Sequence, residues 1–228
     1  MWYKWIDGHP TPLSTSTSKL PAKRASEFFR VVEIDPKPHG TTAFGGVVAG
    51  ETKGHTIWMN YLSMGVDAKV VHDFEWCRTN CKSAFCCQII NKAFYGLWGA
   101  LNCCYCTTMS DIIEAECDSG DGEGFKPLVI PRGLESLVTL NISSFGAGID
   151  VWGPGEAVGG LHQPSVGDGA VELVGIKSSP QLGCAKGGCR DCLDFPRISQ
   201  VKAIKYTLTK PIHMQLDGEA WLQPASEA

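Results

Sequence analysis

After residue 107 the chain consists of short runs rich in apolar and β-branched residues, separated by turns and glycine-rich loops. Three of these runs predict strands, at 135–145, 171–179 and 198–209. A shorter apolar run within 111–125 ends in acidic and glycine residues, which predicts a strand followed by a turn. Together with the glycine-rich loops between them, these segments favour an all-β module in this part of the chain.

The N-terminal part of the chain has a different composition. Residues 1–26 are rich in Pro, Ser, Thr and Lys, so they are predicted to form a flexible segment or linker. A folded domain is predicted over 27–224, followed by a short tail at 225–228. Three early runs of this domain are rich in apolar and aromatic residues and are further strand candidates: 28–34, 44–51 and 55–66.

One stretch has the period of a helix instead. From about 67 to 100, apolar residues recur at helical spacings, for example at Val70, Phe74, Cys77 and Cys81. One or two helices are predicted here. The resulting fold class is mainly β with a helical insertion, that is, α+β.

The C-terminal stretch HMQLDGEAWLQP places Asp217-Gly218 between two runs of alternating residues. Asp-Gly supplies the positive φ angles that a tight primed turn needs, so a β-hairpin is predicted. The turn also brings Asp217 close to Glu219, and paired carboxylates can serve proton or metal chemistry. The local pattern alone favours a plain connector, because Asp-Gly hairpins are common.

Composition and charge exclude several classes of protein. The chain has 228 residues, of which 43% are hydrophobic and 19% charged, as expected for a globular protein with a sizeable core. The net charge is −4 and the basic residues are scattered, so no nucleic-acid partner is expected. The longest nearly apolar run, 93–106, is too short to span a bilayer. The start MWYKWIDGHP lacks the apolar core of a secretory signal, so a cytoplasmic protein with reduced thiols is expected.

Cysteine and histidine provide a weaker set of candidates. Cys184, Cys189 and Cys192 form a C-x4-C-x2-C pattern, and the last two have the spacing of a zinc knuckle. A tetrahedral site needs a fourth ligand, and no Cys or His is adjacent, so these three are weak zinc candidates. Small core residues are the favoured role for the cysteines. The histidines are dispersed, and neither a Ser-His-Asp order nor an HExxH motif supports a hydrolase.

Several segments, taken in order, resemble the accessory region of eukaryotic diacylglycerol kinases. The clearest are MNYLSMGVDAKV (59–70), LVTLNISSFGAGIDVWG (137–153) and MQLDGEAWLQP (214–224). Weaker resembling segments lie between them, at 91–96, 112–118, 168–183 and 197–208. Each segment alone is weakly specific, but the same set in the same order is highly specific. The resemblance implies a two-sheet, sandwich-like accessory domain.

The resemblance also implies a chemistry and a partner. Enzymes of this family transfer the γ-phosphate of ATP, with Mg²⁺, to the free hydroxyl of diacylglycerol and yield phosphatidic acid in lipid signalling. Because diacylglycerol resides in a membrane, such an enzyme works as a peripheral protein at the bilayer surface. By the same resemblance, Asp217 and Glu219 are catalytic candidates beside the cleft, where they would organise Mg²⁺ or assist the attacking hydroxyl.

Five further residues in the resembling segments are substrate or cleft candidates: Asn60, Ser63, Asp67, Asn141 and Trp152. Each of them also has a structural interpretation. Asp67 comes between a strand and a helix, which suits an N-cap. The two asparagines and Ser63 can bond neighbouring backbone. Trp152 can anchor its glycine-rich loop onto a sheet, because tryptophan is usually largely buried.

The sequence differs from the family mainly in lacking the motif that binds the nucleotide. The family holds the ATP phosphates in a Gly-Gly-Asp-Gly-Thr loop of an α/β domain, and no such motif occurs in this sequence. Ala147 replaces a family glycine, and 184–192 is a cysteine-bearing insertion. The chain therefore resembles the C-terminal part of a lipid kinase with the N-terminal α/β nucleotide domain largely absent. The alternative is a catalytically inactive accessory or binding module. A cysteine-based metal or redox protein fits the β motifs poorly.

Overall fold

The structure is a computed structural model of the chain. It describes residues 3–6, 9–12, 30–33, 55–85, 87–102, 105, 107–146, 148–153, 160–186 and 194–225. Near the N-terminus β1 (Tyr3–Ile6) pairs with β2 (His9–Pro12), and β3 (Arg30–Glu33) pairs with β4 (His55–Trp58), both antiparallel. The strand predicted at 28–34 is thus present, whereas the candidate at 44–51 lies outside the described residues.

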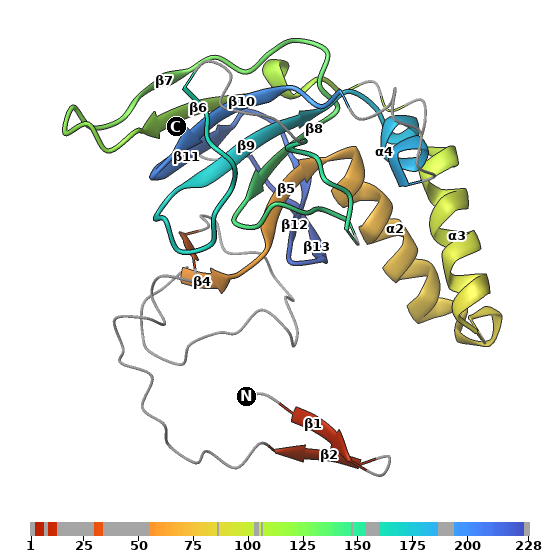
Figure 1. The fold of residues 1–228 in the computed structure, drawn as a ribbon. Helices are drawn as coiled ribbons and strands as arrows, with labels where there is room; N and C mark the ends of the chain where they lie inside the picture. The colour runs from red at the N-terminus through yellow and green to blue at the C-terminus, as the bar shows by residue number, and fades with distance from the viewer. Residues whose placement is uncertain are drawn as a thin grey trace.

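Two antiparallel sheets form the body of the domain (Figure 1). The larger sheet has six strands in the order β10 (Arg197–Val201), β9 (Val171–Ile176), β8 (Ser136–Leu140), β5 (Tyr61–Gly65), β12 (Ile212–Leu216) and β13 (Glu219–Gln223). The smaller sheet has three, in the order β11 (Ala203–Leu208), β6 (Ile113–Asp118) and β7 (Lys126–Leu128). The strands predicted at 135–145 and 171–179 are present but end earlier, at Leu140 and Ile176, and the predicted C-terminal hairpin is confirmed.

The prediction of one strand over 198–209 is wrong. The chain leaves the six-stranded sheet after Val201 and enters the three-stranded sheet at Ala203, with Lys202 between them. The amide of Lys202 donates to the carbonyl of Asp118 at 2.9 Å, which fixes the crossover. The apolar residues Val201 and Ile204 are separated by an odd number of positions, yet both face the same core. A strand that changes sheets permits this, because each half has its own alternation.

The principal core lies between the two sheets. It takes Met64 and Leu137 from the larger sheet, and Ala115 and Leu208 from the smaller one. A hydrogen bond of 2.7 Å between the hydroxyls of Thr139 and Tyr206 also joins the sheets across this core. The sandwich-like, mainly β fold expected from the sequence is therefore confirmed.

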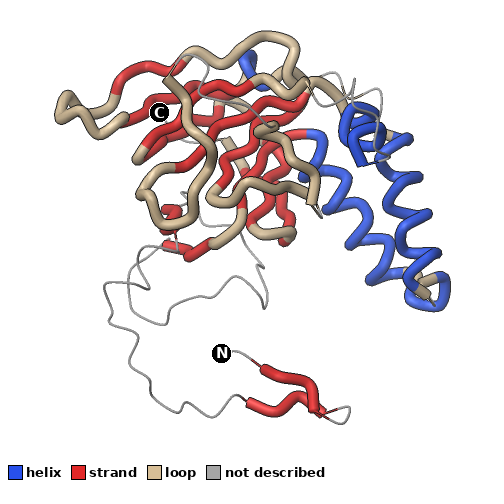
Figure 2. Tube along the Cα trace, in the orientation of Figure 1, coloured by secondary structure: helices blue, strands red, loops and turns tan. Residues whose placement is uncertain are grey.

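Helices gather at one end of the sheets, away from the β6–β7 hairpin (Figures 1 and 2). The predicted helical insertion consists of α2 (Val66–Asn80) and α3 (Gln88–Leu101), with a short 3-10 turn, η1 (Lys82–Ala84), between them. A second 3-10 turn, η2 (Met109–Asp111), precedes β6. The expectation of only strand and loop after residue 107 is wrong at α4 (Ser179–Lys186), which packs on α3. The Ser179 hydroxyl donates to the carbonyl of Gly99 at 2.9 Å.

The other face of the six-stranded sheet carries a second core. Val138 of β8 and Val174 of β9 pack there against Phe145 and Trp152 of the loop after β8, and against Ala185 of α4. Next to this cluster, α2 lies on β5, β12 and β13. The sheet is thus covered on both faces, which explains why every residue of β8 and β9 is buried.

Gly65 makes a direct passage from β5 into α2 possible. Its φ is 118°, and the next amide, of Val66, donates to the carbonyl of Glu135 at 3.0 Å. A Cβ atom on Gly65 would lie 2.1 Å from that same carbonyl oxygen. Only glycine fits both the backbone angle and the space.

We expect Gly65→Ala to destabilise the chain much more than Gly122→Ala. Gly122 also has a positive φ, 85°, but a Cβ there meets no atom within 4 Å. Both variants bear the left-handed strain of about 1 kcal/mol, whereas the Gly65 variant must also move a backbone carbonyl, for a total of about 3 kcal/mol or more. Urea denaturation followed by circular dichroism measures both. Equal losses in the two variants would contradict this account of Gly65.

Candidate functional site

The turn between β12 and β13 has the geometry that the sequence predicts. Asp217 has a φ of 50° and Gly218 a φ of 93°, both positive as in a primed two-residue turn. Leu216 faces Glu219 across the hairpin. Asp217 is the one non-glycine residue with positive φ among those described, and Asp tolerates this conformation better than most residues.

The carboxylate of Asp217 holds a corner of the neighbouring chain. Its Oδ1 accepts the amides of Asn60 at 2.8 Å and Tyr61 at 3.0 Å, and its Oδ2 accepts the amide of Met59 at 2.8 Å. The amide of Asp217 in turn donates to the carbonyl of Tyr61 at 3.0 Å. The side chain therefore connects the hairpin turn to the corner between β4 and β5.

These contacts fix the orientation of the carboxylate but leave one of its hydrogen-bond acceptor positions open. A carboxylate has about four acceptor positions, and three are used by the amides of residues 59–61. The remaining position belongs to Oδ2, and Asp217 is solvent-exposed. The turn thus presents an oriented acceptor at the surface.

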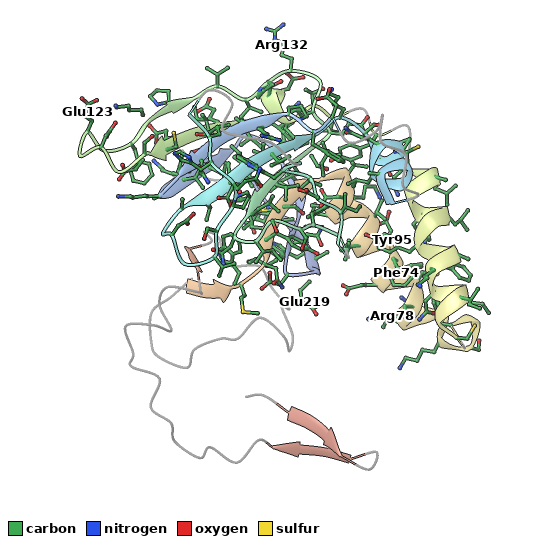
Figure 3. All side chains as sticks on the ribbon, viewed as in Figure 1. Phe74, Arg78, Tyr95, Glu123, Arg132 and Glu219 are labelled. Carbon is green, nitrogen blue, oxygen red and sulfur yellow. The ribbon has the colours of Figure 1, made fainter. Side chains whose placement is uncertain are left out.

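Glu219 lies at the end of the sheet beside α2 (Figure 3). Its neighbour is Glu75 of α2: partial burial raises the pKa of Glu75, and the charge of Glu219 raises it further. The positive charge of Arg78 lowers the pKa of Glu75. Sequence reasoning missed Glu75, because nothing in the local pattern shows that this turn of α2 reaches β13. Among the described residues no group of three or more His, Cys, Asp or Glu side chains is placed to hold a metal ion.

Asp67 is buried at the entry of α2, with 4% of its surface exposed. Its Oδ2 accepts the hydroxyl of Ser63 in β5 and the amide group of Gln215 in β12, the latter at 2.6 Å. Its backbone amide donates to the hydroxyl of Ser136 in β8 at 3.2 Å. The expectation that Asp67 caps α2 is wrong, because Gly65 lets the helix begin at Val66 and the cap position makes no side-chain hydrogen bond.

Burial sets the protonation of Asp67. Removal from water raises the pKa of this carboxyl, and hydrogen bonds from Ser63, Ser136 and Gln215 only partly offset the rise. Its Oδ1 atom has no hydrogen-bond partner among the described residues. Gln215 and Ser136 were also missed from sequence. Their signal was a polar residue inside an otherwise apolar strand, IHMQL for Gln215 and SLVTL for Ser136.

The two asparagine candidates lie at the same corner as Asp217. Asn141 donates from its side chain to the carbonyl of Met59 at 2.7 Å and from its backbone to the carbonyl of Asn60 at 2.9 Å. Beside them, burial, helped by the charges of Asp67 and Asp217, raises the pKa of Tyr61 to about 12. The structural interpretation of these asparagines, bonding to neighbouring backbone, is confirmed for Asn141.

Trp152 is not part of this corner. It is buried in the second core, its indole N–H donates to the carbonyl of His162 at 3.0 Å, and the guanidinium of Arg197 lies 5.5 Å from its ring. The structure favours the role of a loop anchor. Of the zinc candidates, Cys184 is exposed on α4, whereas Cys189 and Cys192 lie outside the described residues.

We expect Asp67→Asn to change how stability depends on pH. Because the folded-state pKa of Asp67 is raised, the unfolded chain loses this proton first, and the wild type loses stability as the pH rises from about 4 through the folded-state pKa. Asparagine keeps an oxygen for Ser63 and Gln215 but cannot ionise. The unfolding free energy of the wild type minus that of the variant should therefore fall as the pH rises above about 4 in urea denaturation. Asp168→Asn, on an exposed turn, is the control. A difference that grows with pH would contradict the burial of a costly charge.

Comparison with known proteins places these elements in a family. The family model described as "Diacylglycerol kinase accessory domain" matches residues 57–220, which includes both the Asp67 network and the Asp217 turn. A solved diacylglycerol kinase from Bacillus anthracis is 15% identical and covers 76% of this chain and 47% of its own, with a TM-score of 0.23. That TM-score is too low to support any comparison of the folds.

Three relatives illustrate the level of similarity. "Probable diacylglycerol kinase 3" of Caenorhabditis elegans is 31% identical over 194 residues, which is 77% of this chain and 24% of the relative. "Diacylglycerol kinase 2" of Arabidopsis thaliana is 31% identical, covering 75% of this chain and 23% of its own length. For human "Diacylglycerol kinase kappa" the identity is 31%, and the shares are 75% and 13%. The chain spans about a quarter or less of these relatives. The match over 57–220 shows that the chain belongs to the diacylglycerol kinase accessory-domain family.

Proposed function

We propose that this chain is the accessory part of an ATP-dependent diacylglycerol kinase that converts diacylglycerol to phosphatidic acid. The observation that carries the proposal is the oriented, exposed carboxylate of Asp217 inside the matched family region. The relatives that cover this region are named diacylglycerol kinases. An enzyme with this substrate works as a peripheral protein at a cytoplasmic membrane surface.

Phosphoryl transfer to a hydroxyl requires little covalent chemistry from the protein. It requires a positioned nucleophile, charge neutralisation at the phosphates and a group that receives the proton of the hydroxyl. In this proposal the open position on Oδ2 of Asp217 accepts that proton as the diacylglycerol oxygen attacks. The amides of residues 59–61 keep the carboxylate in one orientation throughout.

In this proposal Glu219 and Glu75 have a second role, in binding Mg²⁺. Two neighbouring carboxylates suit Mg²⁺, which usually takes one or two protein carboxylates and completes its shell with water and substrate phosphates. Mg²⁺ bound there would supply positive charge to the transferred phosphoryl group. The phosphate-binding loop itself would come from a segment outside this sequence, because no Gly-Gly-Asp-Gly-Thr motif occurs in it.

The alternative function is that of an accessory or binding module without turnover. One observation favours it: three of the four acceptor positions of Asp217 are used to hold the β4–β5 corner, which is a sufficient structural role. Such a module would keep the fold and bind a lipid surface or a protein partner. The two functions differ in whether the Asp217 carboxylate is needed beyond folding.

The test measures transfer of labelled phosphate from ATP to diacylglycerol in detergent micelles. We expect no turnover by the 228-residue chain alone and turnover by a fusion protein in which a relative's nucleotide domain precedes it. In the fusion, Asp217→Asn should lower the rate by about 10²-fold or more. The matched control is Asp168→Asn, because Asp168 is also an exposed turn aspartate that accepts a backbone amide, that of Ala170 at 2.8 Å.

Circular dichroism of each variant separates lost folding from lost chemistry. Asparagine at 217 keeps Oδ1 for the amides of Asn60 and Tyr61, so the variant should remain folded. A fusion protein that is folded but inactive would exclude the kinase function and leave the binding module. Full activity of Asp217→Asn would exclude Asp217 as the proton acceptor.

A further inference from the structure

The outer surface of α3 is apolar. Ile89, Ala93, Leu97 and Leu101 follow one another at intervals of four, so they share one face of the helix. All four are exposed, with 80% of Ile89, 50% of Leu97 and 62% of Leu101 accessible. We call these four residues the α3 outer face. A helix on the surface of a globular domain normally presents polar residues there.

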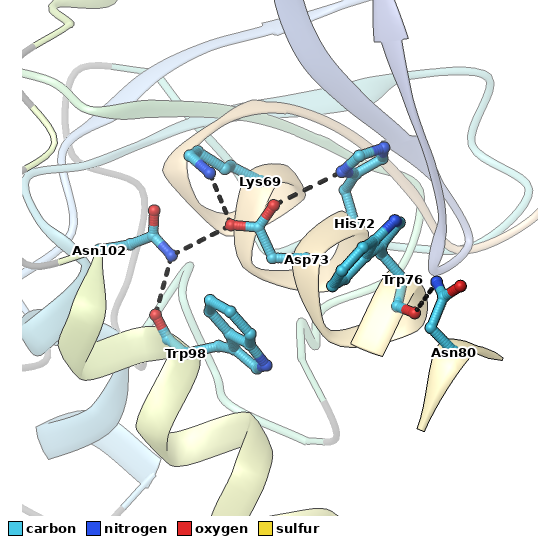
Figure 4. Close-up of polar contacts among 7 residues, drawn as sticks. All are labelled: Lys69, His72, Asp73, Trp76, Asn80, Trp98 and Asn102. Carbon is cyan, nitrogen blue, oxygen red and sulfur yellow. Dashed lines mark hydrogen bonds and ion pairs between the residues drawn. The ribbon is translucent and has the colours of Figure 1, made fainter. Parts of the chain in front are cut away.

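The inner side of α3 already has its packing partners. Phe94 and Tyr95 of α3 contact Phe85 and Phe74, with ring centroids 4.7 and 5.5 Å apart. Asn102, just after α3, donates to the carboxylate of Asp73 in α2 at 3.5 Å and to the carbonyl of Trp98 at 2.9 Å (Figure 4). The helix is therefore held without the outer face, which contacts nothing that explains its apolar character in the described part of the chain.

The charged residues of the segment that contains α3, residues 76–110, are all basic. Between Glu75 and Asp111 the sequence holds no acidic residue, although the whole chain has a net charge of −4. Lys82 in η1 and Lys92 on α3 are exposed. No ion pair involves either lysine among the described residues. An apolar strip beside unpaired cations complements a surface with an anionic layer over an apolar one.

We propose that the α3 outer face, with Lys82 and Lys92 beside it, docks on the surface of an anionic lipid bilayer. The inference rests on the proposed function, in which the substrate resides in a membrane. A helix of 14 residues is about 21 Å long, shorter than a bilayer core. Among the described residues no helix is long and apolar enough to cross a membrane. Such a helix lies in the interface, with its apolar face below the headgroups and its lysines among them.

The fold connects this face to the Asp217 turn. One helix, α2, packs on α3 and also on β12 and β13. The imidazole rings of His72 in α2 and His213 in β12 lie 4.9 Å apart. Figure 1 shows α2 and α3 side by side at one end of the sheets. A bilayer that binds α3 would therefore hold the hairpin turn at a fixed distance and orientation.

The test is co-sedimentation of the full chain with vesicles that contain neither diacylglycerol nor ATP. We expect binding to phosphatidylcholine vesicles that include phosphatidylserine, and weaker binding to phosphatidylcholine alone. Replacing Ile89, Leu97 and Leu101 together by Gln should weaken binding about tenfold or more. Replacing Lys82 and Lys92 by Gln should weaken it about 25-fold, at about fivefold for each cation.

Matched controls come from exposed residues elsewhere. The apolar control replaces Phe125, Val129 and Val166 by Gln, residues that are 51%, 84% and 43% exposed. The charge control replaces Arg132 and Lys210, both exposed, by Gln. Neither control should change binding by more than about twofold at the ionic strength used, because exposed charges distant from the membrane are screened.

Three results would overturn the inference. One is no binding of the wild type to anionic vesicles. Another is an equal loss in the α3 variants and their controls. The third is a wild type that does not bind vesicles and that light scattering shows to be a dimer, which the apolar α3 variant dissociates. The α3 outer face would then be an interface between copies of the chain. A chain that binds vesicles, but whose fusion protein is inactive in micelles, contradicts only the proposed function. An active fusion protein and no vesicle binding contradict only this inference.

Discussion

The buried carboxylate of Asp67 is the interaction on which the arrangement of the domain depends. It joins the first turn of α2 to Ser63 and Gln215, while its amide is bound to Ser136, so one residue contacts three adjacent strands of the larger sheet. A buried carboxyl group is costly unless its hydrogen-bond partners remain in place. Neither α2 nor these strands can shift without breaking these hydrogen bonds, so α2 has one position on the sheet.

Strand β12 connects the buried hydrogen bonds of Asp67 to the surface turn at Asp217. In β12, Gln215 reaches the buried Asp67, and two residues later Asp217 reaches the exposed corner at residues 59–61. The pairing of β12 with β5, for example Leu216 with Leu62, fixes the distance between the two carboxylates. A proton acceptor needs to be held in one orientation by surrounding contacts, since catalysis of phosphoryl transfer rests on positioning together with electrostatic stabilisation. Holding the β4–β5 corner and accepting a proton are therefore compatible roles for Asp217.

Features determined by near neighbours could be predicted from the sequence. The Asp217-Gly218 turn follows from the φ angles that two adjacent residues permit, and most strands follow from short runs of apolar and β-branched residues bounded by turn residues. The partners of Asp67 could not be predicted, because Gln215 comes from a distant strand that only the sheet register brings near. The same holds for Glu75 beside Glu219. The helix start was misplaced because a single glycine at positive φ replaces a side-chain cap.

The outer apolar residues of α3 are not needed for the fold of the sandwich. Neither buried core of the described residues includes a side chain of α3, so the sandwich does not need its outer apolar residues. Polar residues at these positions would satisfy the fold and avoid exposing apolar surface to water. The docking that we propose would give the apolar outer face a contact that the described residues do not supply, and the neighbouring lysines favour an anionic partner. Because α2 touches both α3 and the hairpin, that contact would orient Asp217 relative to the bilayer in which diacylglycerol resides.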